Sequence, residues 1–143
     1  MEKELLRNGD EILSPLAVMI KDGKVLCGYR NYTKDVYKDI SVWTLPGGRT
    51  QVGETVEQAL RREVMEEVGI NEFEIKNFIG ELPGMKANTI MLVFHTTTKQ
   101  EAKLMEPNKF SEWQWVPIND YIKEEKYGHL NPAVQKMIVN YLE

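Results

Sequence analysis

Apolar residues occur along the chain in short runs and alternations separated by turn residues, which is typical of strands joined by tight turns. Asp22 and Gly23 have the composition of a hairpin turn between the first two runs. Pro83 and Gly84 mark another turn later in the chain. The pattern predicts strands at residues 16–20, 24–30, 42–45, 73–82, 88–97 and 112–116, and a polar loop at 31–41.

Two segments have helical character instead. Residues 55–68 contain good helix formers with no proline or glycine, and Gly69 follows where a glycine commonly ends a helix. Residues 132–142 are amphipathic, and Asn131 precedes them as a predicted N-cap. The order of strands, helix, strands and helix predicts a mixed sheet with helices packed on it.

On a helical wheel, the first helix carries acidic residues where an amphipathic helix is normally apolar. Its apolar arc consists of Val56, Ala59, Leu60, Val64 and Val68. Glu67 falls inside this arc, Glu63 lies beside it and Glu66 lies at its edge. Glu57 also falls inside the arc and has no assigned role. Carboxylates crowded together and shielded from water resist ionisation unless a cation compensates them.

The spacing of Glu63, Glu66 and Glu67 is i, i+3, i+4, which lets the three side chains share one cation. Ligands that are all oxygen suit Mg²⁺, with Mn²⁺ as an alternative, and Mg²⁺ also accepts substrate phosphates as ligands. The competing interpretation is a solvent-exposed acidic helix whose glutamates pair with Arg61 and Arg62.

The loop before this helix contains Pro46, Gly47 and Gly48, and glycines allow a close approach of backbone to ligand. Neither the phosphate-binding pattern G-x-x-x-x-G-K-[ST] nor the dinucleotide-binding pattern G-x-G-x-x-G occurs in the chain. Neither of these common nucleotide-binding folds is therefore supported.

From Gly48 to Ile70 the sequence reads GRTQVGETVEQALRREVMEEVGI. It matches every defined position of the Nudix box, G-x5-E-x7-R-E-U-x-E-E-x-G-U, in which U is a bulky aliphatic residue. The chain therefore resembles the Nudix hydrolases. The segment from Trp43 to Gly48 is also similar to this family, and the segment from Glu106 to Asp120 is similar to MutT-like enzymes that act on nucleoside triphosphates. The resemblance implies one domain over residues 1–143 with an α/β/α sandwich fold and a mixed sheet.

The resemblance implies an enzyme that uses a divalent cation and water to hydrolyse a phosphoanhydride bond in a nucleoside diphosphate-linked substrate. Glu63 and Glu67 would be the principal metal ligands, and Glu66 would bind the metal or act close to it. Either Glu66 or Glu67 would take the proton of the attacking water. Arg62 would orient these glutamates through an ion pair.

Further residues are expected to support this chemistry. By the resemblance, Glu54 supports the loop or a second metal, and a backbone carbonyl at Gly47 or Gly48 is an additional metal ligand. Glu112, just before the strand predicted at 112–116, is expected to complete the metal site, and the alternative is a solvated acid at the edge of the strand.

Substrate contacts are expected outside the helix. Arg30 follows a strand and is expected to reach a phosphate, and Gly47 is expected to lie against the substrate. Trp43, Trp113 and Trp115 are candidates for stacking on a base, with Trp43 preferred. Because Trp113 and Trp115 share one face of their strand, the alternative for both is a place in the core.

A nucleoside triphosphate, whether normal, deoxy or oxidised, is the preferred substrate, with a nucleoside monophosphate and pyrophosphate as products. Some ADP-ribose and dinucleoside polyphosphate hydrolases have a proline or tyrosine downstream of the box, where this chain has Met85, Lys86 and Ala87. These substrates and nucleotide sugars remain alternatives. A nucleotide-sensing Nudix domain without catalysis is a second alternative.

The formal net charge of −4 disfavours nucleic acid as a partner, since that interaction relies on basic surfaces. RNA decapping would need a local basic channel. Cys27 is the one cysteine, so no internal disulfide can form. The first residues have no apolar signal core, and no apolar run is long enough to span a membrane. The sequence predicts a cytoplasmic protein and leaves a homodimer open.

Overall fold

The computed structural model describes residues 1–9, 12–31, 41–84 and 88–143. Most of the predicted loop at 31–41, and Met85 to Ala87, lie outside these residues. The elements are α1 (Glu2–Leu5), β1 (Leu13–Lys21), β2 (Lys24–Arg30), β3 (Val42–Thr44), α2 (Val56–Val68), β4 (Glu74–Pro83), β5 (Ile90–Thr97), β6 (Phe110–Pro117), α3 (Ile118–Lys123), the 3₁₀ helix η1 (Glu125–Gly128) and α4 (Pro132–Leu142). Within the described ranges, no helix has the length and apolar character needed to cross a membrane.

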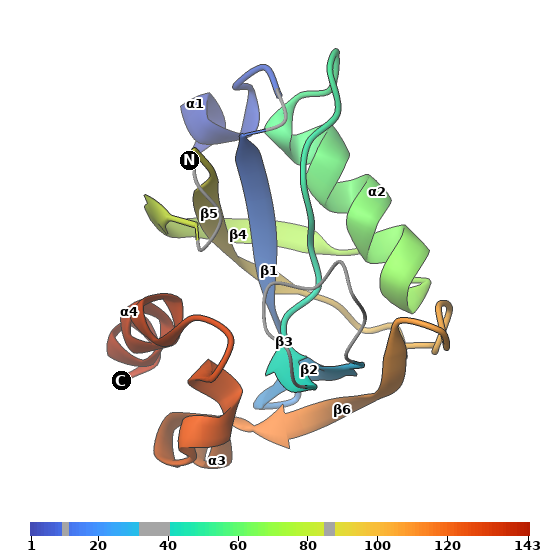
Figure 1. Ribbon diagram of the computed structural model, residues 1–143, viewed down its shortest axis with the longest axis vertical. Helices are drawn as coiled ribbons and strands as arrows, with labels where there is room; N and C mark the ends of the chain where they lie inside the picture. Colours follow the sequence, from blue (N-terminus) through green and yellow to red (C-terminus); the bar gives the residue numbers. More distant parts are fainter. Residues whose placement is uncertain (10–11, 32–40, 85–87) are drawn as a thin grey trace.

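A six-stranded mixed sheet forms the centre of the molecule. Its strands follow the order β3-β2-β1-β5-β4, and β6 pairs with β2 outside this path. β1 and β5 run parallel, whereas the other pairs are antiparallel. Figure 1 shows α2 on one face of the sheet and α3, η1 and α4 on the other. This arrangement confirms the predicted α/β/α fold with a mixed sheet.

Each face of the sheet has its own hydrophobic core. On the α2 face, apolar residues of the helix pack against β1, β5 and β6, with Leu60, Val64, Met19, Phe94, Trp113 and Trp115 among them. On the other face, β1, β2 and β5 pack against α3 and α4, with Val18, Cys27, Val93, Tyr121, Val134 and Ile138 among them. Trp113 and Trp115 therefore belong to the α2 core, which is the structural alternative considered above.

Helix α2 begins one residue after the predicted Thr55, which is its N-cap, and ends before Gly69 as predicted. The Thr55 hydroxyl accepts from the backbone N–H of Gln58, and the Gln58 side chain accepts from the N–H of Thr55. This capping box satisfies amide groups that the first turn leaves unpaired. Glu67 is only 9% exposed, as the wheel predicts. Glu57 differs from the wheel, because it is half-exposed and its carboxylate pairs with Arg61 at 3.0 Å.

The pattern missed the short helices α1, α3 and η1. They contain only four to six residues, too few for a 3.6-residue period to become visible. It also placed the start of β1 at residue 16 instead of Leu13. Ser14 and Pro15 interrupt the apolar run, but both continue the parallel ladder to Met91 and Leu92.

Candidate active site

The loop after β3 is fixed along the edge of β1. Backbone hydrogen bonds join the Ala17 N–H to the Pro46 carbonyl at 2.8 Å and the Gly48 N–H to the Pro15 carbonyl at 3.1 Å. A third joins the Thr50 N–H to the Leu13 carbonyl at 2.9 Å. The loop therefore runs along β1 like a short additional strand, and it places Gly47 and Gly48 next to α2.

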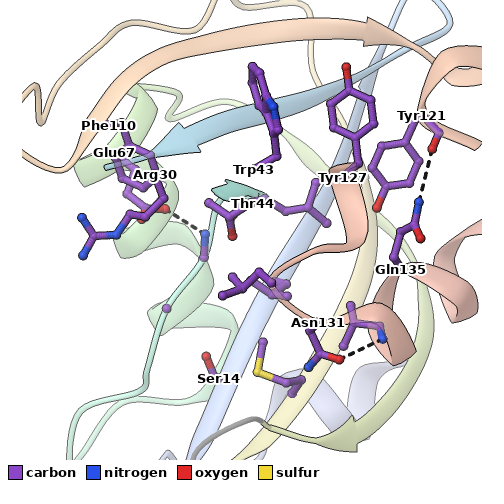
Figure 2. Close-up of a pocket in the computed structure, with 17 residues that line it drawn as sticks. Ser14, Arg30, Trp43, Thr44, Glu67, Phe110, Tyr121, Tyr127, Asn131 and Gln135 are labelled. Atoms are coloured by element: carbon purple, nitrogen blue, oxygen red, sulfur yellow. Dashed lines mark hydrogen bonds between the residues drawn. The ribbon is translucent and has the colours of Figure 1, made fainter. Parts of the chain in front are cut away.

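Both glycines lie too close to their neighbours for a larger residue. The Gly47 N–H donates to Glu67 Oε1 at 2.8 Å, which Figure 2 marks as a dashed line. A Cβ at Gly48 would lie 2.6 Å from Glu63 Oε2. The backbone therefore contacts two carboxylates of the helix directly, and the glycines permit this approach.

Replacing Gly47 with alanine is expected to destabilise the fold. Gly47 has φ +147°, and a Cβ there would meet the Pro15 carbonyl oxygen at 2.3 Å. We expect a loss of about 1–3 kcal/mol in the free energy of unfolding, measured by urea denaturation. Gly53→Ala is the matched control, because Gly53 also has positive φ, +91°, but no atom lies within 4 Å of its Cβ position. An equal loss in both variants would show that the contact with Pro15 is unimportant.

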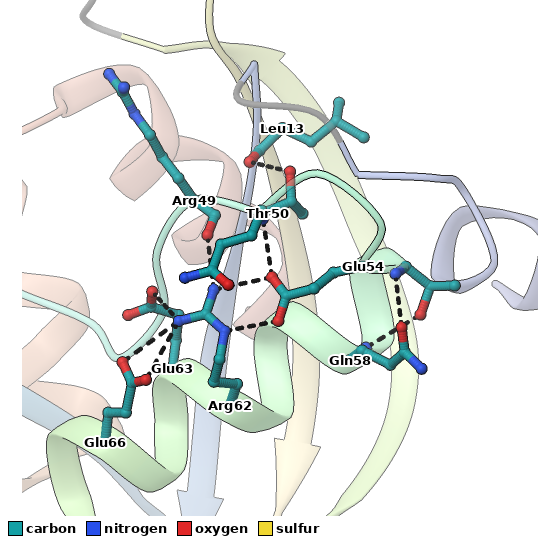
Figure 3. Close-up of polar contacts among 10 residues, drawn as sticks. Leu13, Arg49, Thr50, Glu54, Gln58, Arg62, Glu63 and Glu66 are labelled. Atoms are coloured by element: carbon teal, nitrogen blue, oxygen red, sulfur yellow. Dashed lines mark hydrogen bonds and ion pairs between the residues drawn. The ribbon is translucent and has the colours of Figure 1, made fainter.

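Arg62 lies at the centre of a group of carboxylates (Figure 3). Its Nε and Nη2 bind both oxygens of Glu54, at 2.6 and 3.0 Å. Its Nη1 donates to Glu63 at 2.8 Å and to Glu66 at 3.3 Å, and its Nη2 also donates to the Arg49 carbonyl. One guanidinium therefore connects the loop to two glutamates of α2, and its charge-assisted bonds are of the strong, directional kind.

The pKa values of these carboxyls differ according to their surroundings. Arg62 lowers the pKa of Glu54, mainly by hydrogen bonding. Burial raises the pKa of Glu63, although Arg62 opposes this effect. Burial also holds the pKa of Glu67 well above its usual value. The hydrogen bond from the Gly47 N–H lowers this pKa, whereas the charges of Glu63 and Glu106 raise it further. The charged form of Glu67 is therefore costly until a positive charge lies beside it.

Glu106 is an acidic neighbour of this group that the sequence did not single out. Its charge raises the pKa of both Glu63 and Glu67. Lys109 Nζ lies 3.4 Å from Glu106 Oε2 and lowers the pKa of Glu67. Glu106 begins the segment that resembles the MutT-like enzymes, but its loop position gave no periodic signal.

The expectation that Glu112 completes the metal site stays a prediction. Glu112 lies on β6 opposite Tyr29 and is exposed. Neighbouring Trp113 packs on the α2 side of the sheet. Because successive side chains of a strand alternate between faces, Glu112 points away from α2.

A divalent cation fits the chemistry of these donors but requires some rearrangement. Within the described residues, no three acidic, histidine or cysteine side chains already form a compact cluster for a metal ion. Glu63 and Glu66 instead bind Arg62, and Glu67 binds Gly47. The donor set is nonetheless all oxygen, as Mg²⁺ and Mn²⁺ prefer. The buried carboxyl of Glu67 is the group that would gain most from a nearby cation.

Next to Glu67 a pocket of about 340 Å³ opens between the sheet and the α3–α4 layer. Figure 2 shows Glu67 and Arg30 on one side and Tyr121, Asn131 and Gln135 on the other. This volume lies within the range of small-molecule sites. Its wall is mainly apolar and aromatic, and includes Leu16, Trp43, Leu45, Met91, Phe110, Tyr121, Tyr127, Leu130 and Val134.

The predicted substrate residues Arg30, Trp43 and Gly47 all line this pocket, as do Gly48 and Glu67. The Arg30 guanidinium lies 5.5 Å from the centre of the Phe110 ring and donates to the Lys109 carbonyl at 3.1 Å. Trp113 and Trp115 are absent from the lining described for this pocket. Sequence reasoning did not find Tyr121 or Tyr127, which lie in α3 and η1, and it identified Asn131 only as a helix cap.

Fold and site together have the arrangement of a Nudix-type domain, and comparison with known proteins agrees. The NUDIX domain model matches residues 13–136. The chain therefore belongs to the Nudix hydrolase family, as the box predicted. Nudix hydrolases generally use divalent metal ions.

Individual relatives agree with this assignment. An RNA pyrophosphohydrolase of Blochmanniella floridana is 29% identical over 131 residues, which cover 73% of this chain and 82% of that protein. A putative 8-oxo-dGTP diphosphatase of Bacillus subtilis is 53% identical over 34 residues, covering 24% of this chain and 23% of that protein. The crystal structure of a MutT NUDIX hydrolase from Burkholderia pseudomallei has a TM-score of 0.69 at 21% identity, covering 88% of this chain and 96% of that one. The last of these supports the fold alone.

Proposed function

We propose that this protein hydrolyses nucleoside triphosphates to a nucleoside monophosphate and pyrophosphate, with residues 1–143 acting as one catalytic domain. The observation that carries the proposal is the position of Glu67. This buried carboxyl lines a pocket with aromatic walls, and a basic side chain, Arg30, lies on the same side (Figure 2). A base and ribose fit such a pocket, and the phosphates would then extend toward the glutamates of α2.

In this proposal Glu63, Glu66 and Glu67 hold Mg²⁺, or Mn²⁺ in its place, together with the carbonyl of Gly48. When bound, the cation would neutralise phosphate oxygens and make a water molecule more acidic. Glu106 is added as a further ligand, since its charge already acts on Glu63 and Glu67.

The side chains of this chain have separate roles in the proposed reaction. Glu66 or Glu67 accepts the proton of the attacking water. Glu67 lines the pocket, and Glu66 shares the Arg62 guanidinium with Glu63. Arg62 keeps Glu63 and Glu66 oriented through its bonds of 2.8 and 3.3 Å. Arg30 binds a phosphate, Trp43 contacts the base, and the backbone at Gly47 lies against the substrate.

The substrate is tested by measuring product release with Mg²⁺ from a panel. The panel contains normal and oxidised nucleoside triphosphates, ADP-ribose, a nucleotide sugar and a dinucleoside polyphosphate. We expect pyrophosphate and a monophosphate from the triphosphates, at a kcat/KM above that of the other compounds. A higher kcat/KM for ADP-ribose or a dinucleotide would contradict the substrate assignment but keep the chemistry. No turnover of any compound, despite tight nucleotide binding, would favour a sensor domain.

RNA with a 5′-terminal triphosphate is the second candidate substrate. Its support is the similarity to an RNA pyrophosphohydrolase over 73% of this chain. The bond broken would be of the same kind, so the α2 glutamates would serve both reactions. A short 5′-triphosphorylated RNA therefore belongs in the same panel. If its kcat/KM exceeds that of each free triphosphate, RNA replaces the free nucleotide as the substrate.

A further inference from the structure

The segment between β5 and β6 brings Glu106 to α2 without regular structure of its own. None of residues 98–109, all of which the structure describes, lies in a helix or strand. Figure 1 shows the segment passing the end of α2 on its way to β6. Such a segment keeps a fixed position only through contacts with its neighbours. The contacts of residues 98–106, called the strap below, therefore decide where the Glu106 carboxylate lies.

Gln100 attaches the start of the strap to the chain that leaves α2. Its Oε1 accepts from the backbone N–H groups of Asn71 and Glu72, both at 3.0 Å. Its Nε2 donates to Asn71 Oδ1 at 2.9 Å. Backbone donors in irregular chain need such partners when no ladder supplies them. One amide therefore makes three hydrogen bonds to the segment that directly follows the helix carrying the glutamates.

Two further contacts hold the strap against the end of α2 as it approaches Glu106. The Lys103 N–H donates to the Val68 carbonyl at 2.8 Å, at the last residue of the helix. A Cβ at Gly69 would lie 3.3 Å from Met105 Sδ, so Met105 covers the helix end at close range. The position of Glu106 is thereby coupled to the C-terminus of α2.

The ion pairs of this region are weaker restraints than the Gln100 amide. Lys21 pairs with Glu101, but the Glu101 side chain is largely exposed. Lys109 Nζ lies 3.4 Å from Glu106 Oε2, and the lysine side chain is half-exposed. Exposed ion pairs of this kind contribute little to stability and do not fix a side chain in one direction. Gln100 therefore makes the most extensive directional attachment of the strap.

We propose that Gln100 is a positioning residue for the metal site, which holds the strap so that the Glu106 carboxylate can reach a cation bound by Glu63 and Glu67. This role rests on the proposed function, in which Glu106 is a metal ligand. Its charge already acts on both glutamates of α2. Residues that orient ligands change metal affinity without touching the metal. Loss of Gln100 should therefore weaken cation binding only as far as Glu106 contributes to it.

Mn²⁺ binding to the nucleotide-free protein tests this role without requiring turnover, with the free ion measured by electron paramagnetic resonance. We expect Gln100→Ala to raise the Kd for Mn²⁺ roughly tenfold, the lower end of the range for residues that support a ligand. Glu106→Gln should raise it at least as much. The double variant should bind no more weakly than Glu106→Gln alone, because both substitutions then remove the same ligand. Independent effects would instead multiply.

Two variants separate positioning from a general loss of structure. Gln100→Glu keeps an oxygen that can accept from the Asn71 and Glu72 N–H groups, so it should bind Mn²⁺ as the wild type does. Gln114→Ala is the matched control, because it removes an exposed glutamine side chain from β6 and should leave the affinity unchanged. Thermal melts with EDTA should show a cooperative transition for every variant.

Wild-type affinity in Gln100→Ala would overturn the assigned role, as would a double variant whose loss is the product of the two single losses. A Gln100→Glu variant no better than Gln100→Ala would overturn it too. If Glu106→Gln binds Mn²⁺ as the wild type does, Glu106 is not a ligand, and the role of Gln100 fails with that part of the proposed function. Failure of the proposed substrate appears separately, as the absence of triphosphate hydrolysis in the product assay.

Discussion

Glu67→Gln is expected to reduce kcat for hydrolysis with Mg²⁺ by roughly 10²–10⁴-fold, the range for loss of a group that moves a proton at the reacting centre. The substitution keeps the size of the side chain and an oxygen at Oε1, which can still accept from the Gly47 N–H. It removes the negative charge that the proposed cation and the attacking water require. Steady-state kinetics on the panel substrate with the highest kcat/KM measures the effect.

The same variant is expected to be more stable than the wild type when divalent cations are absent. Burial raises the pKa of Glu67, so the folded state binds its proton more tightly than the unfolded state does. This contribution to stability is complete at pH values below the usual carboxyl pKa and is lost as the pH rises through the raised pKa of the folded state. Glutamine avoids this loss. Thermal melts with EDTA at pH 4 and pH 8 should therefore show a gain for the variant at pH 8 only.

Mg²⁺ should reverse this order, because it raises the melting temperature of the wild type by binding the folded state. Glu57→Gln is the matched control on the same helix. Glu57 is half-exposed and pairs with Arg61, so this variant should keep activity and the response to Mg²⁺. If Glu67→Gln retains wild-type kcat, the proposed role of α2 is wrong.

Arg62→Ala is expected to lower both stability and activity. The substitution would leave Glu54 without its bidentate partner and Glu63 and Glu66 without their shared cation. The neighbouring carboxylates raise the pKa of Arg62, which reflects how strongly the folded state holds its charge. Because the arginine side chain is only 23% exposed, we expect a loss of about 2–3 kcal/mol in the free energy of unfolding.

Arg62→Lys separates charge from geometry, since a lysine keeps the charge but cannot make the two parallel bonds to Glu54. It should recover part of the stability and little of the activity. Arg61→Ala is the control in the adjacent position, where the guanidinium pairs with half-exposed Glu57 and packs on the Phe73 ring. A smaller loss of activity in Arg62→Ala than in Arg61→Ala would contradict the assigned role of Arg62.

The helix and its glutamates were predictable because periodicity is a local property of the sequence. The start of α2 within one residue of the predicted Thr55, its end before Gly69 and the burial of Glu67 all follow from the pattern of residues within one element. Family resemblance then assigned the metal-binding chemistry to that helix. The same wheel wrongly placed Glu57 within the buried arc of α2. A wheel shows the direction of each side chain around the helix axis, but it does not show how far along the helix the neighbouring elements extend.

The opposite wall of the pocket was not predictable in this way. Tyr121 lies in a six-residue helix and Tyr127 in a four-residue one, so neither has a periodic context. The contact of Tyr127 with Trp43, and of Tyr121 with Tyr127, depends on how the chain after β6 folds back over the sheet, a long-range property. The role of Glu112 stays a prediction for a related reason, since the sequence did not reveal which face of β6 it occupies.

The most direct test of the account is a crystal structure of the wild type with Mg²⁺ and a nucleoside triphosphate analogue whose α,β-bridging oxygen is replaced by methylene. The account predicts the cation between the phosphates and the carboxylates of Glu63 and Glu67, and the base in the pocket beside Trp43 and Tyr121. A cation held away from α2, or a nucleoside bound outside this pocket, would contradict it.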